Sequence, residues 1–165
     1  LGQKLIGNKE NEITHAASMV EGLDLAGCIV TADALNTQEK FASALIQRKA
    51  DYCLAVKQNH KSLFYDIQLS FVDRTETRTV EIEKVELGHG RIETRKISVL
   101  PGSCLPVALL KKWTGLDEGT IIKAVTESIN KTTGEISSLD RYYISSLNVL
   151  GARIAKQCVG GVRHH

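Results

Sequence analysis

The sequence predicts an α/β protein in which a mixed sheet with flanking helices carries a β-rich insertion. Up to about residue 75, short apolar runs alternate with amphipathic segments, and from there to Leu147 the apolar pattern has a period of two. The chain has 165 residues, of which 42% are hydrophobic and 24% charged, a composition typical of one globular domain. A chain of this length buries enough surface to fold without disulfides or a structural metal.

Two apolar runs in the first part predict adjacent parallel strands. Residues 28–32 form the first candidate for a buried strand, which ends at Asp33, and residues 52–56 form the second, which ends at Lys57. A helix between two strands, all within about thirty residues, is the pattern of a right-handed βαβ unit.

The helix of this unit is predicted to begin at Asn36, a favoured N-cap residue, because Glu39 follows three positions later. Another helix is expected from about residue 15 to 23, and a third from about residue 61 to 72. The third helix has an apolar face formed by Leu63, Ile67 and Phe71.

Two hairpins are predicted in the second part. Residues 80–83 and 92–95 alternate between apolar and polar side chains around a Gly-rich turn at 88–90. Residues 121–129 and 136–144 form the second pair. We therefore expect a core portion in residues 1–77 and a β-rich insertion in residues 78–147. The start of a final helix is expected in residues 148–165.

Charge and spacing exclude several classes of site. The net charge is +2, from 21 basic and 19 acidic residues, so DNA binding would need a local basic patch. The four cysteines lack a C-x-x-C pair, and we expect buried thiols. The histidines lack zinc-hydrolase spacing, and neither a G-x-S-x-G motif nor a Walker loop occurs. No membrane span or secretory signal is apparent, which predicts a soluble intracellular protein.

Asp33 is the first candidate for chemistry, because ligands of open α/β sheets bind at the carboxyl ends of the strands. The alternative is an ordinary loop or capping residue. A single carboxylate would hold a hard cation weakly, since such ions take about six oxygen ligands. Further acids would have to come from elsewhere.

The turn after the second strand is a candidate phosphate-binding element at the same sheet edge. Lys57, Asn59 and Lys61 could contact a phosphate backbone there. The alternative is a solvated loop in which Asn59 caps the next helix.

The turn of the first hairpin is a second candidate for phosphate binding. It lacks the third Gly of a dinucleotide fingerprint and joins two strands, so that function is disfavoured. The side chains that could contact phosphates are His89, Arg91, Arg95 and Lys96. Alternatively, the glycines serve only the turn, and the arginines pair with Glu81, Glu83 or Glu86 across the hairpin.

Five segments, in order, resemble the catalytic domain of bacterial insertion-sequence transposases of the DDE type, specifically the H-repeat-associated group. They are residues 11–14, 27–34, 52–59, 88–95 and 141–147. Each segment is a weak signal alone, whereas all five in this order are specific.

This resemblance implies an RNase H-like fold in which three acids hold two Mg²⁺ or Mn²⁺ ions. Asp33 matches the second acid, as both catalytic residue and metal ligand. The first acid would precede Leu1, and residues 162–165 resemble the lead-in to the third, a Glu. The sequence departs from the family in containing one of the three acids, so we expect this fragment to bind the metal weakly and to lack activity.

The resemblance also implies that the intact enzyme cuts and rejoins DNA at insertion-sequence ends in the bacterial cytoplasm. Its ions would activate water or a 3′-hydroxyl for attack on a phosphodiester. The expected partners are DNA and further copies of the chain, not a membrane. Two alternatives stay open: a non-catalytic remnant that binds DNA or parent subunits, and an unrelated α/β metal-dependent hydrolase. DNA affinity without cleavage would indicate the first, and a small-molecule pocket at Asp33 the second.

Overall fold

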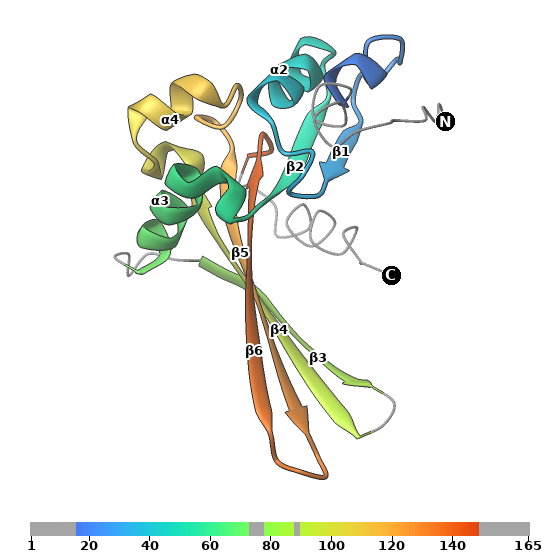
Figure 1. Cartoon of the computed structure of the whole chain (residues 1–165), viewed down its shortest axis with the longest axis vertical. Helices are drawn as coiled ribbons and strands as arrows, with labels where there is room; N and C mark the ends of the chain where they lie inside the picture. The colour runs from blue at the N-terminus through green and yellow to red at the C-terminus, as the bar shows by residue number, and fades with distance from the viewer. Residues whose placement is uncertain (1–15, 73–77, 88–89, 149–165) are drawn as a thin grey trace.

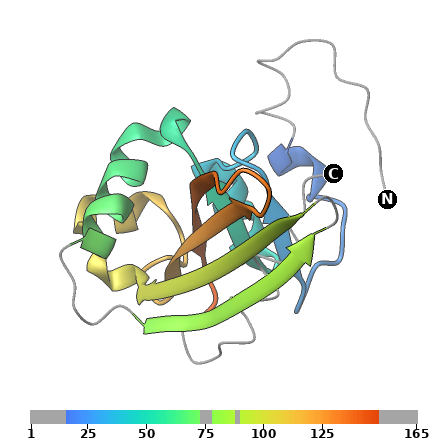
Figure 2. The same cartoon turned by 90° about the horizontal axis from the view of Figure 1, so that it is seen from below.

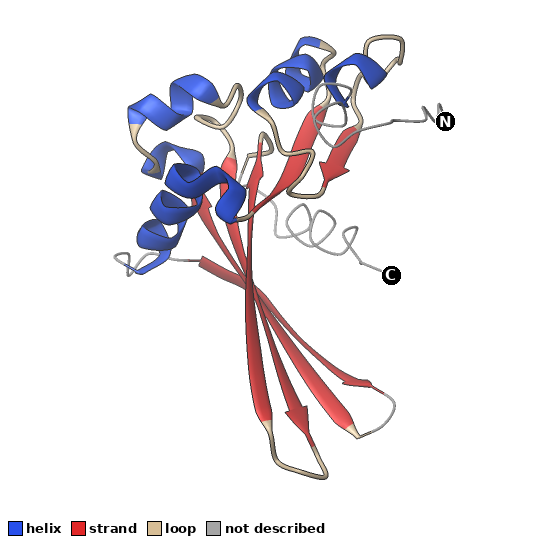
Figure 3. Cartoon of the chain, in the orientation of Figure 1, coloured by secondary structure: helices blue, strands red, loops and turns tan. Residues whose placement is uncertain are grey.

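The computed structural model describes residues 16–72, 78–87 and 90–148, and the strands within these ranges form one six-stranded sheet (Figures 1 and 3). The strand order is β1-β2-β6-β5-β4-β3. The strands are β1 (Ile29–Ala32), β2 (Asp51–Val56), β3 (Arg78–Leu87), β4 (Arg91–Pro101), β5 (Thr120–Asn130) and β6 (Ile136–Ser145). The mixed α/β architecture predicted from the sequence is therefore confirmed.

The predicted βαβ unit is present, since β1 pairs in parallel with β2 and α2 (Glu39–Gln47) connects them. Strand β2 is buried, as expected, but β1 is not, and Ile29 is 41% exposed. The expectation of two buried strands was wrong for β1 because, among the strands that the structure describes, β1 pairs only with β2 and lies at the edge of the sheet.

The helices differ from the prediction mainly at their ends. Gln38, not Asn36, is the N-cap of α2, and its side chain makes no capping hydrogen bond. Of the helix expected over residues 15–23, residues 16–19 are helical, and the final helix expected beyond residue 148 lies outside the described residues. Helix α3 (Lys61–Val72) has the predicted limits.

Both predicted hairpins are confirmed, β3 with β4 and β5 with β6, but the segment between them was missed. Between β4 and β5 the chain forms a 3-10 turn (Gly102–Cys104) and the helix α4 (Val107–Lys112). The period-two pattern does not extend through this segment, where Pro106 takes the N-cap position of α4.

The far parts of the hairpin strands form an extension that we call the arm. It consists of β3 with residues 91–96 of β4, 125–130 of β5 and 136–140 of β6, and it projects away from the helices (Figure 1). In the β6 part of the arm every residue is exposed, including Ile136 and Leu139. The arm is thus a sheet with solvent access, in contrast to the packed part beside β2.

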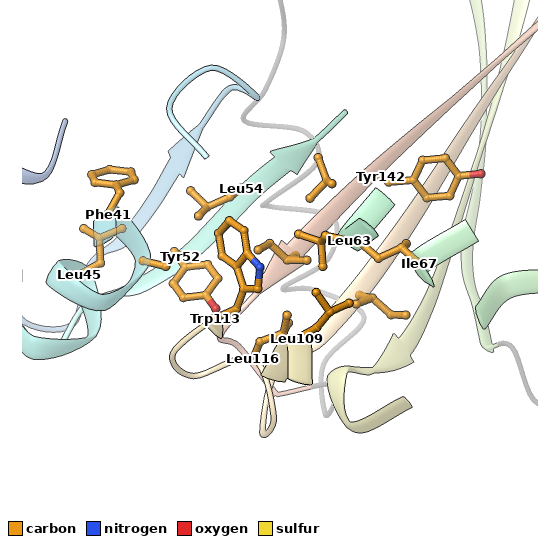
Figure 4. Packing of buried hydrophobic residues seen from close by; sticks show 14 of the residues in the cluster. Phe41, Leu45, Tyr52, Leu54, Leu63, Ile67, Leu109, Trp113, Leu116 and Tyr142 are labelled. Carbon is orange, nitrogen blue, oxygen red and sulfur yellow. The ribbon is translucent and has the colours of Figure 1, made fainter. Parts of the chain in front are cut away.

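The main core lies on one face of the sheet, beneath the helices (Figures 2 and 4). Phe41 and Leu45 of α2, Leu63 and Ile67 of α3, and Leu109 of α4 pack against β2, β4, β5 and β6. A smaller cluster lies on the other face and includes Cys53, Ala55, Ile122 and Tyr143. The two faces follow the alternation of side chains along each strand.

Two further expectations concern cysteines and membranes. Of the three cysteine thiols described, Cys53 is buried and Cys104 partly buried, but Cys28 is exposed. The expectation of buried thiols was therefore wrong for Cys28, which directly precedes the edge strand β1.

Within the described ranges, the helices are too short or too polar to cross a bilayer.

Candidate functional site

Asp33 follows the last residue of β1 and has an exposed carboxylate whose position is fixed by Asn36. Asp33 Oδ1 accepts hydrogen bonds from the backbone N–H of Asn36 at 3.2 Å and from its side-chain Nδ2 at 3.1 Å. This is the local Asx geometry that competes with capping. The expectation that Asn36 caps α2 was wrong because Asn36 serves this turn instead.

Thr37 links the loop that follows β1 to strand β2. Its Oγ1 lies 3.0 Å from the carbonyl oxygen of Asp33 and 2.6 Å from that of Ala55. A hydroxyl has one proton, so it can donate to only one of these oxygens at a time, but it contacts both. Thr37 itself is fully buried.

Asn59 links the loops that follow β1 and β2, because its Nδ2 donates a hydrogen bond of 2.8 Å to the carbonyl of Ala34. This contact differs from the helix cap that we considered for Asn59. The parallel pairing of β1 with β2 and this hydrogen bond confirm that the Lys57 turn lies at the same sheet edge as Asp33. The side chains of Lys57 and Lys61 are exposed there.

His60 is the third link, and the sequence analysis did not single it out. Its Nε2 donates a hydrogen bond to the carbonyl of Thr37. Its ring makes a T-shaped contact with the ring of Trp113, with centroids 5.4 Å apart and planes at 82°. No spacing in the sequence indicated this contact, because Trp113 comes from the segment after α4, far along the chain.

The hairpin candidates lie on two faces of the arm. Arg91 and Arg95 share one face of β4, as predicted, whereas Lys96 lies on the opposite face. Arg95 forms an ion pair of 3.2 Å with Glu93 on the same strand. That contact differs from the cross-hairpin pairs considered as the alternative. His89 lies outside the described residues.

The arm arginines lie well away from Asp33. In the sheet register Val56, the last residue of β2, pairs with Tyr142 of β6, which pairs with Lys123 of β5. Lys123 pairs with Ser98 of β4, so Ser98 lies level with the end of β2. Arg91 lies roughly 23 Å farther along β4 than Ser98, at about 3.3 Å per residue. The basic residues therefore divide into a group at the Lys57 turn and a group on the arm.

The described residues contribute a single acid to the candidate metal site. Within these ranges, no group of three or more His, Cys, Asp or Glu side chains lies close enough to hold an ion. The Asp33 carboxylate is a suitable hard donor, but one carboxylate supplies too few ligands for Mg²⁺. Any ion bound here would need ligands from residues outside the described part.

Comparison with known proteins gives a consistent group of relatives. The chain is 31% identical over 170 residues to "Putative transposase YncI" of Escherichia coli O157:H7, an alignment that covers all of this chain and 42% of the relative. It is 27% identical over 169 residues to "H repeat-associated putative transposase YhhI" of Escherichia coli K12, with 43% of that relative covered. The chain is thus similar to proteins named putative transposases, one of them H repeat-associated.

A further relative, "Uncharacterized protein in dhlA 3'region" of Xanthobacter autotrophicus, is 31% identical over 147 residues, which cover 88% of this chain and 48% of the relative. No protein-family model matches the chain. The relationship to H repeat-associated transposases that the five sequence segments indicated is thus confirmed by whole-chain similarity. The chain spans less than half the length of each of these relatives.

Proposed function

We propose that this chain is part of a DNA transposase with an RNase H-like catalytic domain, which cuts and rejoins DNA strands at insertion-sequence ends. The observation that carries the proposal is the placement of Asp33. It presents an exposed carboxylate at the carboxyl end of a parallel strand in a chain related to named transposases. This is the position where α/β sheets bind ligands.

Asp33 would act as one ligand of Mg²⁺ or Mn²⁺, with further acids supplied by the rest of a longer protein. The ion would activate the attacking oxygen and stabilise the leaving oxygen of the phosphodiester. Asn36 donates two hydrogen bonds to Oδ1, one from its backbone N–H and one from its side chain, and these orient the carboxylate. By itself, the described part of the chain is expected to bind metal weakly and to leave DNA uncut.

DNA would contact the two basic groups. At the Lys57 turn the proposed contacts are Lys57 and Lys61 with the polar Asn59, whose side chain bonds to the loop of Asp33, and on the arm they are Arg91, Arg95 and Lys96. His89, outside the described residues, is proposed as a further contact. The exposure of Lys57, Lys61 and Arg91 supports this assignment. Arg95 would have to share its guanidinium between Glu93 and a phosphate. We further propose that the intact enzyme is a homo-oligomer in the bacterial cytoplasm.

The test uses a full-length transposase that contains this segment, with its own terminal sequences on a supercoiled plasmid. Asp33→Asn should abolish strand cleavage with Mg²⁺ or Mn²⁺ while most DNA affinity is kept. Asp24→Asn is the matched control, because Asp24 also accepts a local backbone hydrogen bond, from Ala26 at 3.3 Å, but lies before β1. Normal cleavage by Asp33→Asn would overturn the proposed role.

A second candidate is a remnant that binds DNA or parent subunits without cutting. It is favoured for this segment alone because the described residues contribute one acid, Asp33, to the candidate site. If the longer wild-type protein binds the terminal sequences but does not cleave them with either ion, this second function replaces the first.

A further inference from the structure

We propose that Arg141 is a further DNA-contacting residue, which connects the Lys57 turn to the arm arginines as one basic track across a single face of the sheet. The inference rests on the proposed function, because it takes DNA as the partner. Arg141 belongs to neither of the two basic groups, since it directly follows the β6 part of the arm.

The alternation of side chains places Arg141 on the same face of the sheet as Lys57. In β2, Cys53 and Ala55 belong to the smaller hydrophobic cluster, and Lys57 is the next residue on that side. In β6, Tyr143 belongs to the same cluster, so Arg141, two residues before it, also lies on that side. The main core lies on the opposite face.

Arg141 and Lys57 also lie opposite each other at the end of β2. Val56 pairs with Tyr142, so one further step along this antiparallel register brings Lys57 level with Arg141. The backbone of Lys57 is still extended, with φ −129° and ψ −175°, and it continues the strand by one residue. The two backbones are therefore roughly 5 Å apart, the spacing of neighbouring strands. Both residues are exposed.

On its other side, Arg141 leads to the arginines of the arm. Through β5, Arg141 is level with Ile97 of β4, and Arg95 lies on the same face two residues toward the tip. Lys57 and Arg95 are thus separated by three strand spacings and two residues, roughly 16 Å, with Arg141 between them. Arg91 continues the track along β4, and its Lys57 end lies at the sheet edge where DNA would be cut.

Arg141 and Lys57 form a pair of like charges that no described carboxylate neutralises. On this face the register surrounds Arg141 with Ala124 and Lys57 across the strands and with Leu139 and Tyr143 along β6. The ion pairs among the described residues involve other side chains. Like charges directly opposite each other in a sheet are destabilising, and an anion bound between them removes that cost. A phosphate of the DNA backbone is such an anion.

The guanidinium of Arg141 is oriented by Tyr143. Burial raises the pKa of Tyr143, and the charge of Arg141 and a hydrogen bond from its side chain partly offset this shift. An Arg side chain has five N–H donors, so a bond to one hydroxyl leaves others for a phosphate. By contrast, Arg95 is paired with Glu93 and lies opposite Glu83 in the register. Arg141 is therefore the more available cation.

The test uses the full-length transposase and a duplex of the terminal sequence of its element. Arg141→Gln and Arg141→Ala remove the charge, Arg141→Lys keeps it, and Tyr143→Phe removes the hydroxyl beside it. The matched control is Lys123→Gln, because Lys123 pairs with Tyr142 on the opposite face, where it forms an ion pair with Asp140. The measurements are DNA affinity at several salt concentrations, phosphate-ethylation interference and melting temperature.

Arg141→Gln and Arg141→Ala should each lower the slope of log affinity against log salt by about 0.9, the value for one phosphate contact. Arg141→Lys should keep most of the slope, and Lys123→Gln and Tyr143→Phe should leave it unchanged. In the interference assay, Arg141→Gln should lose a phosphate that lies between those lost by Lys57→Gln and by Arg95→Gln.

The inference is overturned if either charge-removing variant folds and keeps the salt slope and the interference pattern of the wild type. It is also overturned if Lys123→Gln or Tyr143→Phe lowers the slope by as much. In these cases the wild type still binds its terminal sequence and Asp33→Asn still fails to cleave it, so the proposed function stands. A wild type that does not bind this duplex overturns the proposed function and this inference with it, and that failure is recognised before any substitution is made.

Discussion

The hydroxyl of Tyr52 donates a hydrogen bond of 2.9 Å to the backbone carbonyl of Thr114. Tyr52 is fully buried in β2, and Thr114 belongs to the segment between α4 and β5. Burial, with smaller contributions from Asp117 and Asp51, raises the pKa of Tyr52 well above its ordinary value of 10.0. The βαβ unit and the segment inserted between the hairpins are therefore joined by a buried polar contact.

Tyr52→Phe should lower the free energy of unfolding by about 1–2 kcal/mol, because it leaves the Thr114 carbonyl without this donor. Urea denaturation followed by circular dichroism measures the change. Tyr65→Phe is the control, since Tyr65 is 60% exposed and its replacement should have little effect. Equal losses in the two variants would show that the buried contact contributes nothing.

Alkaline pH should destabilise the fold through the same residue. The pKa of Tyr52 is higher in the folded than in the unfolded chain, so its stabilising contribution is complete below the unfolded pKa near 10 and is lost as the pH rises toward the folded pKa. Unfolding free energy should fall above pH 10 by about 1.4 kcal/mol per pH unit from this group. Denaturation series at several pH values should give a shallower decline for Tyr52→Phe.

Gly119→Ala should be strongly destabilising, because an added Cβ would lie 2.0 Å from the carbonyl oxygen of Ser145. We expect a loss of about 3 kcal/mol, the upper end of the range for overpacking, since the obstructing atom is backbone. Gly22→Ala is the control, as nothing lies within 4 Å of a Cβ added there. A melting temperature for Gly119→Ala equal to that of Gly22→Ala would contradict this close approach.

Arg91→Ala with Arg95→Ala should lower the salt dependence of DNA binding by the longer transposase. Each phosphate contact contributes about 0.9 to the slope of log affinity against log salt, so the double variant should reduce the slope by roughly two. Lys96→Ala, on the other face of β4, tests whether both faces of the arm contact DNA. An unchanged slope in a folded double variant would remove the arginine face from the proposed DNA-binding surface.

The local parts of the fold were predictable because their patterns are local. The βαβ unit, α3 and both hairpins follow from apolar periodicity and turn residues close together in sequence. The helix α4 was missed because its six residues are too few to establish a period, although Pro106 marked its start. The antiparallel pairing of β2 with β6 was not predicted either, since nothing in the two segments specifies the other as a partner.

The candidate site was predictable to a similar degree. Asp33 and the Lys57 turn could be placed together because the carboxyl ends of parallel strands meet at one edge of a sheet. The roles of Thr37 and His60 could not, since they depend on contacts with Ala55 and Trp113 that only the folded chain creates. Asn36 was predicted to cap α2, whereas it bonds to Asp33, because helix caps and Asx turns favour the same residue types.

The pairing of β2 with β6 has a consequence for synthesis on the ribosome. Ser145 bonds to Tyr52 across a sequence separation of 93 residues, whereas the hairpins close over a few residues. At ~5–20 residues per second, β2 would wait roughly 5–20 seconds for its second neighbour. During that interval its open edge is available to other nascent chains or to chaperones, so the yield of native protein should depend on how quickly translation delivers β6.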